Sequence, residues 1–270
     1  MGVLMIKDKF FKVNPKLYIR LRDIFHYAQN IKKKRESKRI YMANKAEYLK
    51  QNKDNRFLIS TRYERPCLED RFEDAGSMGC YFWQDLWAAR LVKKNNPTLH
   101  YDIASRVDGF IGMLSAFSQK TKMIDIRPLE SVIPDIDFFQ ADATTLEGID
   151  DESVESISAL CSLEHFGLGR YGDTIDPNAW YYAMKSIVRV IKPGGHAYIA
   201  VPVGQEHLEF DAHRVFYAST VAETFEPMKL IEFSTIHTSD TVIEKDVPIH
   251  KYDDDESIGG HRFGLFHFVK

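Results

Sequence analysis

The chain has 270 residues, which is enough for one large domain or for one domain with an appendage. Hydrophobic residues make up 44% and charged residues 28%, which is typical of a globular protein and excludes a disordered, collagen-like or membrane-spanning chain. The net charge of −3 is unevenly distributed, because residues 1–62 hold 17 Lys and Arg against 5 Asp and Glu and the remaining 208 residues therefore carry −15.

The basic N-terminal part is predicted to be helical. Between Leu17 and Ala28, apolar residues recur at spacings of three and four, as on one face of an amphipathic helix. We therefore divide the chain into a basic helical N-terminal extension, residues 1–75, and an α/β domain, residues 76–270. The positive charge is densest in residues 32–39, and such a run is most often a solvated helical face. Peripheral contact with an anionic membrane surface is the alternative, and nucleic acid is disfavoured because the larger domain is acidic.

The N-terminal residues and the cysteines both favour a cytoplasmic protein. The apolar start is broken at Lys7, which leaves it too short for the apolar region of a secretory signal. The three cysteines, Cys67, Cys80 and Cys161, are odd in number and widely scattered, so they indicate neither a disulfide framework nor a metal knuckle.

From residue 99 onward, short runs rich in Ile, Val, Phe and Tyr alternate with helix-length amphipathic segments. We predict strands at residues 99–103, 122–126, 137–140, 154–160, 196–201, 229–233 and 263–269. Helices are predicted between them, one along residues 107–117 and another that Asp176 begins as N-cap and residues 193–195 end. The alternation predicts an α/β fold with a Rossmann-like, doubly wound, mostly parallel sheet of about seven strands. Residues 238–260 are polar and predicted to be a solvated excursion before the last strand.

Acidic residues follow three consecutive predicted strands. Ligands of such sheets bind beyond the carboxyl ends of the strands, where Asp102, Asp125 and Asp142 stand. Asp125 lies 23 residues after Asp102, close to the spacing at which a carboxylate accepts both hydroxyls of a ribose. Asp142 stands beside small residues, where it could accept the amino group of a purine. A single acid at a strand end is usually only a helix N-cap, but three in series favour a ligand site.

Three further motifs carry a resemblance to a known family. Residues 140–143 (QADA), 163–165 (LEH) and 189–195 (RVIKPGG) are similar, in order and spacing, to the post-strand motifs of class I S-adenosylmethionine-dependent methyltransferases. The resemblance covers residues 80–270. The strings at 81–87, 166–173 and 211–216 also resemble an uncharacterised domain-of-unknown-function branch of this superfamily, which has no assigned substrate.

The resemblance implies S-adenosylmethionine as cofactor and a methyltransferase-type sheet. It implies that Asp125 binds the ribose, Asp142 the adenine amino group, and Asp102 with residues 104–109 the methionine part. The implied cofactor-binding residues are Asp102, Ala104, Ser105, Gly109, Asp125, Ile126, Asp142 and Ala143. The sequence departs from the family in its first loop, because Ala104, Arg106 and Asp108 stand where glycines usually allow the backbone to approach the ligand.

Histidines after the fourth and fifth strands of the parallel series are the candidate catalytic bases. His165 and His213 suit proton removal near neutral pH, although a hydrogen-bonded structural role is the common alternative. The candidate substrate-binding residues are Glu164, Arg170, His207 and Arg214. We expect no metal, because His165, His207 and His213 with Glu164 or Glu209 are scattered over two loops without a ligand spacing.

These features predict methyl transfer from S-adenosylmethionine to a small-molecule substrate, a small polar acceptor. A sugar or glycan precursor is favoured because the post-strand loops are polar. One alternative is a non-catalytic ligand-binding or interaction module on the same fold, since the first loop lacks its usual glycines. The other is a nucleotide-sugar or nicotinamide-dependent enzyme, because Arg127 beside Asp125 could meet a phosphate, although no G-x-G-x-x-G turn is present.

Overall fold

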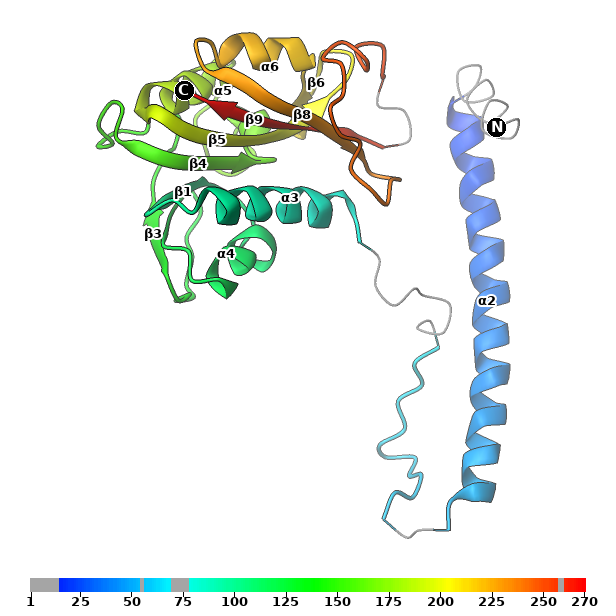
Figure 1. The fold of residues 1–270 in the computed structure, drawn as a ribbon. Helices are drawn as coiled ribbons and strands as arrows, with labels where there is room; N and C mark the ends of the chain where they lie inside the picture. Colours follow the sequence, from blue (N-terminus) through cyan, green and yellow to red (C-terminus); the bar gives the residue numbers. More distant parts are fainter. Residues whose placement is uncertain (1–14, 54–55, 69–77, 257–259) are drawn as a thin grey trace. The chain divides into compact units, whose positions relative to one another are not determined.

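A computed structural model describes residues 15–53, 56–68, 78–256 and 260–270 of the chain (Figure 1). The chain divides into two units, Met1–Ser77 and Met78–Lys270, which are described separately. In the described ranges, no helix combines the length and the apolar character that crossing a bilayer requires.

The first unit is built on one long helix, α2 (Pro15–Gln51), so the helix predicted from the apolar spacing between Leu17 and Ala28 is confirmed. The segment after it returns along its second half. There the Lys45 ammonium lies 2.7 Å from the Glu64 carboxylate, and the Tyr48 hydroxyl donates to the carbonyl of Phe57 at 2.8 Å. Residues 32–35 are exposed, as expected of a charged helical face, and their attraction to an anionic surface stays a prediction.

The second unit contains a seven-stranded sheet in the order β3-β2-β1-β4-β5-β9-β8. Its strands are β1 (His100–Ile103), β2 (Thr121–Asp125), β3 (Ile136–Gln140), β4 (Val154–Leu160), β5 (Ile191–Val203), β8 (Lys229–His237) and β9 (Arg262–Val269). The first five pair in parallel, whereas β9 runs antiparallel to both β5 and β8. The predicted doubly wound, mostly parallel sheet of about seven strands is confirmed.

Helices cover both faces of the sheet, and an apolar core lies on each side (Figure 1). On one face α5 (Ala179–Val190) and α6 (Ala218–Thr224) bury residues such as Met184 and Val221 against the strands. On the other, α3 (Cys80–Asn95), a π-helical turn η2 (Val107–Ile111) and α4 (Gly112–Ala116) pack through residues such as Phe110. The central strands β4, β5 and β9 are largely buried on both faces, which explains their near-continuous apolar runs.

The boundaries predicted for α5 are wrong at both ends. Asp176 is not the N-cap, because its carboxylate accepts from the backbone of Asn178, and Asn178 itself precedes the first helical residue. At the other end the helix stops at Val190, since Ile191 already pairs with Val154 of β4. Strand pairing therefore overrides the Pro-Gly-Gly stop signal, and β5 begins five residues before the predicted 196.

A short hairpin after β5 was not predicted. It consists of β6 (His207–Glu209) and β7 (His213–Val215), in which Glu209 pairs with His213. Three-residue strands carry too few apolar residues to show an alternating pattern, so the sequence offers no signal for them.

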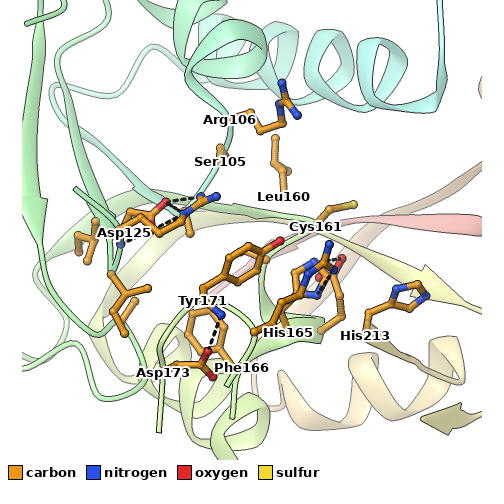
Figure 2. Close-up of a pocket in the computed structure, with 18 of the residues that line it drawn as sticks. Ser105, Arg106, Asp125, Leu160, Cys161, His165, Phe166, Tyr171, Asp173 and His213 are labelled. Atoms are coloured by element: carbon orange, nitrogen blue, oxygen red, sulfur yellow. Dashed lines mark hydrogen bonds and ion pairs between the residues drawn. The ribbon is translucent and has the colours of Figure 1, made fainter. Parts of the chain in front are cut away.

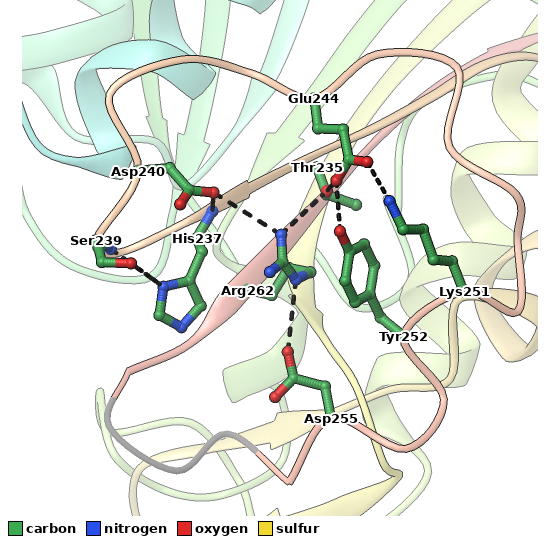
Figure 3. Close-up of polar contacts among 9 residues, drawn as sticks. All are labelled: Thr235, His237, Ser239, Asp240, Glu244, Lys251, Tyr252, Asp255 and Arg262. Atoms are coloured by element: carbon green, nitrogen blue, oxygen red, sulfur yellow. Dashed lines mark hydrogen bonds and ion pairs between the residues drawn. The ribbon is translucent and has the colours of Figure 1, made fainter. Parts of the chain in front are cut away.

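The described part of the polar excursion at residues 238–260 is attached to β9 by ion pairs and ring contacts rather than simply solvated. Figure 3 shows Arg262 of β9 at its centre, with the guanidinium 3.7 Å from the centre of the Tyr252 ring and 3.4 Å from the Asp255 carboxylate. Glu244 accepts from both Lys251 and Tyr252. The start of β9 is thereby anchored to the excursion, next to His261, which directly precedes the strand.

Candidate active site

A cavity of about 890 Å³ lies beyond the carboxyl ends of β1, β2, β3 and β4. This volume is within the range of cavities that enclose small ligands, and the position is where open α/β sheets bind them. In Figure 2, Asp125 stands on one side of the cavity, His165 and His213 stand on the other, and Tyr171 lies between them.

Most of the residues predicted to bind cofactor or substrate line this cavity. They are Ala104, Ser105, Gly109, Asp125, Ile126, Asp142, Ala143, Glu164, His165, Arg170 and His213. Asp102, His207 and Arg214 are not part of its lining in the described part of the chain. The structure thus brings residues from four post-strand loops and from the β6–β7 hairpin to one space, whereas their binding roles stay predictions.

Asp102 holds the loop after β1, residues 104–109, in place through hydrogen bonds. Its carboxylate is fully buried and accepts from the backbone N–H of Ser105 at 3.0 Å and from the hydroxyls of Ser105 and Ser158 at 2.7 and 2.6 Å. Burial raises the pKa of Asp102 to about 6. Ala104 adopts φ 58°, the left-handed conformation that glycine accepts most easily. The loop therefore takes a turn suited to glycine without a glycine at that position.

Gly109 leaves room for its neighbour on α3, the Asp85 side chain. A Cβ at this position would lie 2.2 Å from the Asp85 carboxylate oxygen. Asp85 is buried and lines the cavity, and burial raises its pKa to about 6. The contact ties the loop after β1 to α3 through a carboxylate that changes charge near neutral pH.

Asp125, the predicted ribose ligand, is paired inside its own loop. The Arg127 guanidinium donates to both carboxylate oxygens, from Nε at 3.0 Å and from Nη2 at 2.5 Å, and the backbone N–H of Arg127 donates at 2.8 Å. Arg127 also lies over the Tyr171 ring, 4.8 Å from its centre. A diol can therefore bind the Asp125 carboxylate only if it displaces the bidentate Arg127 guanidinium.

Asp142, predicted to bind the adenine amino group, is exposed at the mouth of the cavity. One of its oxygens accepts from the backbone N–H of Thr144 at 2.8 Å, which is a local turn contact. Ala143 behind it is buried in the core, and Ile126 follows the end of β2. These small and apolar groups give the cavity a partly apolar side beside two carboxylates.

Glu164 and His165 lie together in η3 (Leu163–His165), a short 3₁₀ turn after β4. Burial raises the pKa of Glu164 to about 8, so its carboxyl group is protonated at neutral pH. Burial also lowers the pKa of His165 to about 4, which leaves its ring neutral. His165 Nδ1 lies 2.6 Å from the carbonyl oxygen of Ala212, and this acceptor requires the proton on Nδ1. Nε2 therefore holds the lone pair and lies 3.8 Å from the Glu164 carboxyl.

The loop of residues 166–173 is organised by Asp173. Its carboxylate accepts from the backbone N–H groups of Gly167 and Gly169 at 2.8 and 3.2 Å. The Tyr171 ring is presented to the cavity, with the Arg170 guanidinium 5.2 Å from its centre. Arg170 donates to the Ala212 carbonyl at 2.9 Å, so this loop and the β6–β7 hairpin are joined above η3.

Two predicted substrate-binding residues have other partners. The Arg214 guanidinium donates to the backbone carbonyls of Phe166 and Glu164 at 2.6 and 3.3 Å, which fastens the hairpin to η3. His207 Nδ1 lies 2.6 Å from the carbonyl of Gln205, and its other nitrogen lies 3.4 Å from the Glu209 carboxylate. The structure therefore places Arg214 as a positioning residue and His207 on the hairpin, away from the cavity.

His213 is half-buried at the cavity wall. Burial and the nearby His261 imidazole lower its pKa, and its Nε2 lies 3.6 Å from the Glu209 carboxylate. The His213 and His261 rings meet edge to face, with centres 4.5 Å apart. His261 lines the same cavity from the segment before β9.

Sequence reasoning missed Asp85, Cys161, Tyr171 and His261 as lining residues. Asp85 lies on α3 before the first strand, where the rule about strand ends gives no signal. Cys161 directly follows β4, and its thiol donates to Gln84 at 3.0 Å, so the strand-end rule could have found it. His261 reaches the cavity only because antiparallel β9 begins at that end of the sheet.

Comparison with known proteins adds one sequence match. Residues 125–256 match the family model described as Caenorhabditis protein of unknown function, DUF268. This region, just under half of the chain, includes Asp125, Glu164, His165 and His213 but neither Gly109 nor His261. The predicted resemblance to an uncharacterised family is confirmed over these residues. No curated protein matches the chain.

Solved structures are similar to the chain at low identity. The Burkholderia thailandensis 1,6-didemethyltoxoflavin-N1-methyltransferase, bound to S-adenosylhomocysteine, is 14% identical over 70% of this chain and 79% of its own, with a TM-score of 0.46. The N-methyltransferase NodS from Bradyrhizobium japonicum WM9 in complex with S-adenosylhomocysteine is 14% identical over 69% and 85%, with a TM-score of 0.45. The [4+2]-cyclase SpnF is 13% identical over 69% and 81%, with a TM-score of 0.48.

Proposed function

We propose that the cavity binds S-adenosylmethionine and that the chain transfers its methyl group to a small polar acceptor. The observation that carries the proposal is the shared cavity of Asp125, Asp142 and His165. Two carboxylates after adjacent strands suit a ribose and an adenine amino group, and a neutral imidazole stands on the opposite wall. Bound there, the cofactor would supply an electrophilic methyl group on a sulfonium sulfur.

The residues that line the cavity fit this cofactor. Asp125 and Asp142 would hold its nucleoside part, and the loop of residues 104–109 would lie along its methionine part. Ala104 holds the left-handed φ of 58° that such a tight turn needs, although it is not glycine. Arg127 must release at least one Asp125 oxygen for the ribose to bind. The pair can open because the Arg127 side chain is 44% exposed.

His165 is the proposed base for the acceptor. Its Nδ1–H is held by the Ala212 carbonyl, so Nε2 can accept a proton from an acceptor hydroxyl or amine as methyl transfer proceeds. Glu164 is neutral at neutral pH because its pKa is about 8, so it can donate a hydrogen bond without repelling an electron-rich acceptor. Arg170 and Tyr171 border the same space and supply charge and an aromatic face.

We extend the proposal to a sugar or glycan precursor as the acceptor. The wall around His165 combines an aromatic face, Tyr171, with polar groups such as Asp173 and Arg170. Hydroxyl-rich rings bind through this combination, in which ring faces pack on an aromatic side chain and hydroxyls find hydrogen-bond partners.

A second candidate function is a ligand-binding module without methyl transfer. The observation that favours it is the closed Asp125–Arg127 pair, which occupies both oxygens of the proposed ribose ligand. In such a module the pair would be permanent and no adenosylated ligand would bind.

Thermal unfolding of the full chain with S-adenosylhomocysteine separates the two candidates, because a ligand of the folded state raises its stability. We expect a rise in Tm, and an affinity lower by about 10- to 100-fold in Asp125→Ala, since a hydrogen bond to an ionised carboxylate contributes about 1.5–3 kcal/mol. Asp137→Ala, at an exposed position of β3, is the matched control and should bind as the wild type does.

Arg127→Ala sharpens the same experiment. Without the guanidinium the ligand no longer has to break an ion pair, so the affinity should rise several-fold on the methyltransferase proposal. No Tm rise with S-adenosylmethionine or S-adenosylhomocysteine, in folded wild type and in Arg127→Ala, would overturn that proposal. A rise with NAD or a nucleotide sugar instead would favour the corresponding enzyme.

A further inference from the structure

Three potential ligand atoms converge beside the cavity. They belong to Glu209, His213 and His261, and all lie within 4.8 Å of one another. Glu209 and His213 face each other across the β6–β7 hairpin, whereas His261 arrives from the segment before β9. The group is therefore assembled by the tertiary fold and has no sequence spacing.

The contacts within this cluster are too long for hydrogen bonds. The Glu209 carboxylate lies 3.6 Å from His213 Nε2 and 4.0 Å from His261 Nε2. His213 Nε2, the nitrogen that faces Glu209, is buried and has no hydrogen-bond partner among the described residues. Buried polar atoms without partners are rare and call for an unseen water or ion.

The spacing fits a metal ion better than it fits a protein contact. Zinc binds imidazole nitrogen and carboxylate oxygen at about 2.0–2.2 Å, which sets neighbouring tetrahedral ligand atoms about 3.3 Å apart. The observed 3.6 and 4.0 Å need only to close by less than about 1 Å around such an ion. The Glu209 side chain is 38% exposed, and its other carboxylate oxygen lies 3.4 Å from His207 Nε2, so among the described residues only this weak contact opposes that adjustment.

The surroundings hold two of the three ligands in place. The carbonyl of His261 accepts from the backbone N–H of Thr238 at 2.9 Å, and the adjacent Arg262 is anchored by Tyr252 and Asp255 (Figure 3). His213 belongs to the hairpin strand that Arg214 fastens to η3. Fixed imidazoles and one adjustable carboxylate form a prepared site rather than a chance cluster.

We propose that Glu209, His213 and His261 bind a divalent transition-metal ion, with zinc as the natural occupant. Two imidazoles and one carboxylate suit zinc, cobalt or nickel and do not suit magnesium or calcium, which prefer oxygen ligands. His213 and His261 also line the cavity, so the ion lies at its wall. Three protein ligands leave a coordination position for a water or for an oxygen of a cavity ligand.

The inference goes beyond the proposed methyl transfer and is tested without activity. Full-length protein is stripped with a chelator and titrated with Co²⁺, whose visible absorption reports low-coordinate nitrogen and oxygen ligation, and Zn²⁺ is then added in competition. We expect one ion per chain. Glu209→Gln, His213→Gln and His261→Gln should each weaken binding by at least about 10- to 100-fold, the loss that follows even when an outer partner of a ligand is removed.

His250→Gln is the matched control, because His250 is exposed in the same excursion and pairs with Asp253 at 2.9 Å. It should bind cobalt as the wild type does. Absence of stoichiometric binding in the wild type, or binding that all three ligand variants retain, would overturn the metal site. Glu209→Gln carries the test if a histidine variant does not fold, since Glu209 is the most exposed ligand.

The Tm rise with S-adenosylhomocysteine, measured on the same variants, distinguishes the two proposals. Cobalt binding without that rise leaves the metal site standing and removes the methyltransferase proposal. The reverse result removes the metal site alone.

Discussion

The two walls of the cavity are built in opposite ways. The post-strand wall, formed by residues 104–109, 125–127 and 141–144, carries carboxylates that bond within their own loops, Asp125 to Arg127 and Asp142 to Thr144. The histidine wall, formed by residues 164–173, 213 and 261, joins segments that are far apart in the sequence, and burial keeps Glu164, His165 and His213 neutral at neutral pH. The first wall is held by local contacts, and the second is held by contacts between distant segments around these three neutral groups.

This difference explains what the sequence could predict. Parallel strands end at one edge of the sheet, so Asp125 and Asp142 could be placed at the cavity from strand positions alone. The role of Arg214 could not, because its partners are backbone carbonyls of Phe166 and Glu164 that carry no sequence identity. His261 was missed because its place depends on where antiparallel β9 begins.

The overall fold was predictable for the same reason. Buried strands and amphipathic helices leave apolar patterns, and the sheet and α2 followed from them. Element ends were less predictable, since pairing of Ile191 with Val154 ends α5 earlier than its glycines indicate. The contact between Asp85 and Gly109 also gives no pattern, because it depends on the packing of α3 against the first loop.

The largest expected effect is a loss of stability from a substitution in the histidine wall. Gly167 has φ 75°, and a Cβ there would lie 1.8 Å from the carbonyl oxygen of Asp176. Gly167→Ala should lower the free energy of unfolding by about 2–5 kcal/mol, since left-handed backbone costs about 1–2 kcal/mol and overpacking adds about 1–3 kcal/mol. Urea denaturation measures the loss.

Gly172→Ala is the control for this variant. Gly172 has φ 86°, but nothing lies within 4 Å of its added Cβ, so only the backbone cost of about 1–2 kcal/mol is expected. Equal losses in the two variants would mean that the Asp176 contact does not shape this loop.

A second variant tests the neutral state of the histidine wall. Unfolding lets Glu164 ionise above its ordinary pKa of 4.5, whereas the folded group stays protonated up to about 8. The unfolded state therefore binds fewer protons, and this group lowers the stability as pH rises from about 4.5 to 8. The effect amounts to about 1.4 kcal/mol per pKa unit.

Glu164→Gln should flatten the upper part of this pH profile. Asp85 and Asp102, each with a pKa raised to about 6, act in the same direction below about pH 6, but buried histidines such as His165, with a pKa lowered to about 4, act there in the opposite direction, so the comparison is made above pH 6. Urea midpoints measured between pH 4.5 and 8.5 check this result. The exposed Glu130→Gln serves as control, and a slope above pH 6 equal in both variants would contradict a protonated Glu164.

The smallest expected effect is a change in stability from a substitution in the post-strand wall. Ala104→Gly relieves the cost of φ 58° and gives back part of the gain through the larger entropy of the unfolded chain. We expect a net stabilisation of less than about 1 kcal/mol. Ala143→Gly, at a buried position of the same wall, should instead destabilise. A loss in both variants would mean that Ala104 is not strained.

The contact between Gly109 and Asp85 has an optical consequence. Two of the three tryptophans of the chain, Trp83 and Trp87, stand on α3 on either side of Asp85. The Trp87 indole N–H donates to Glu232 at 3.0 Å, and Trp83 is half-buried. We expect a ligand that moves the first loop to change the fluorescence of both indoles through Asp85. The chain thus contains its own fluorophores at the helix that the loop touches.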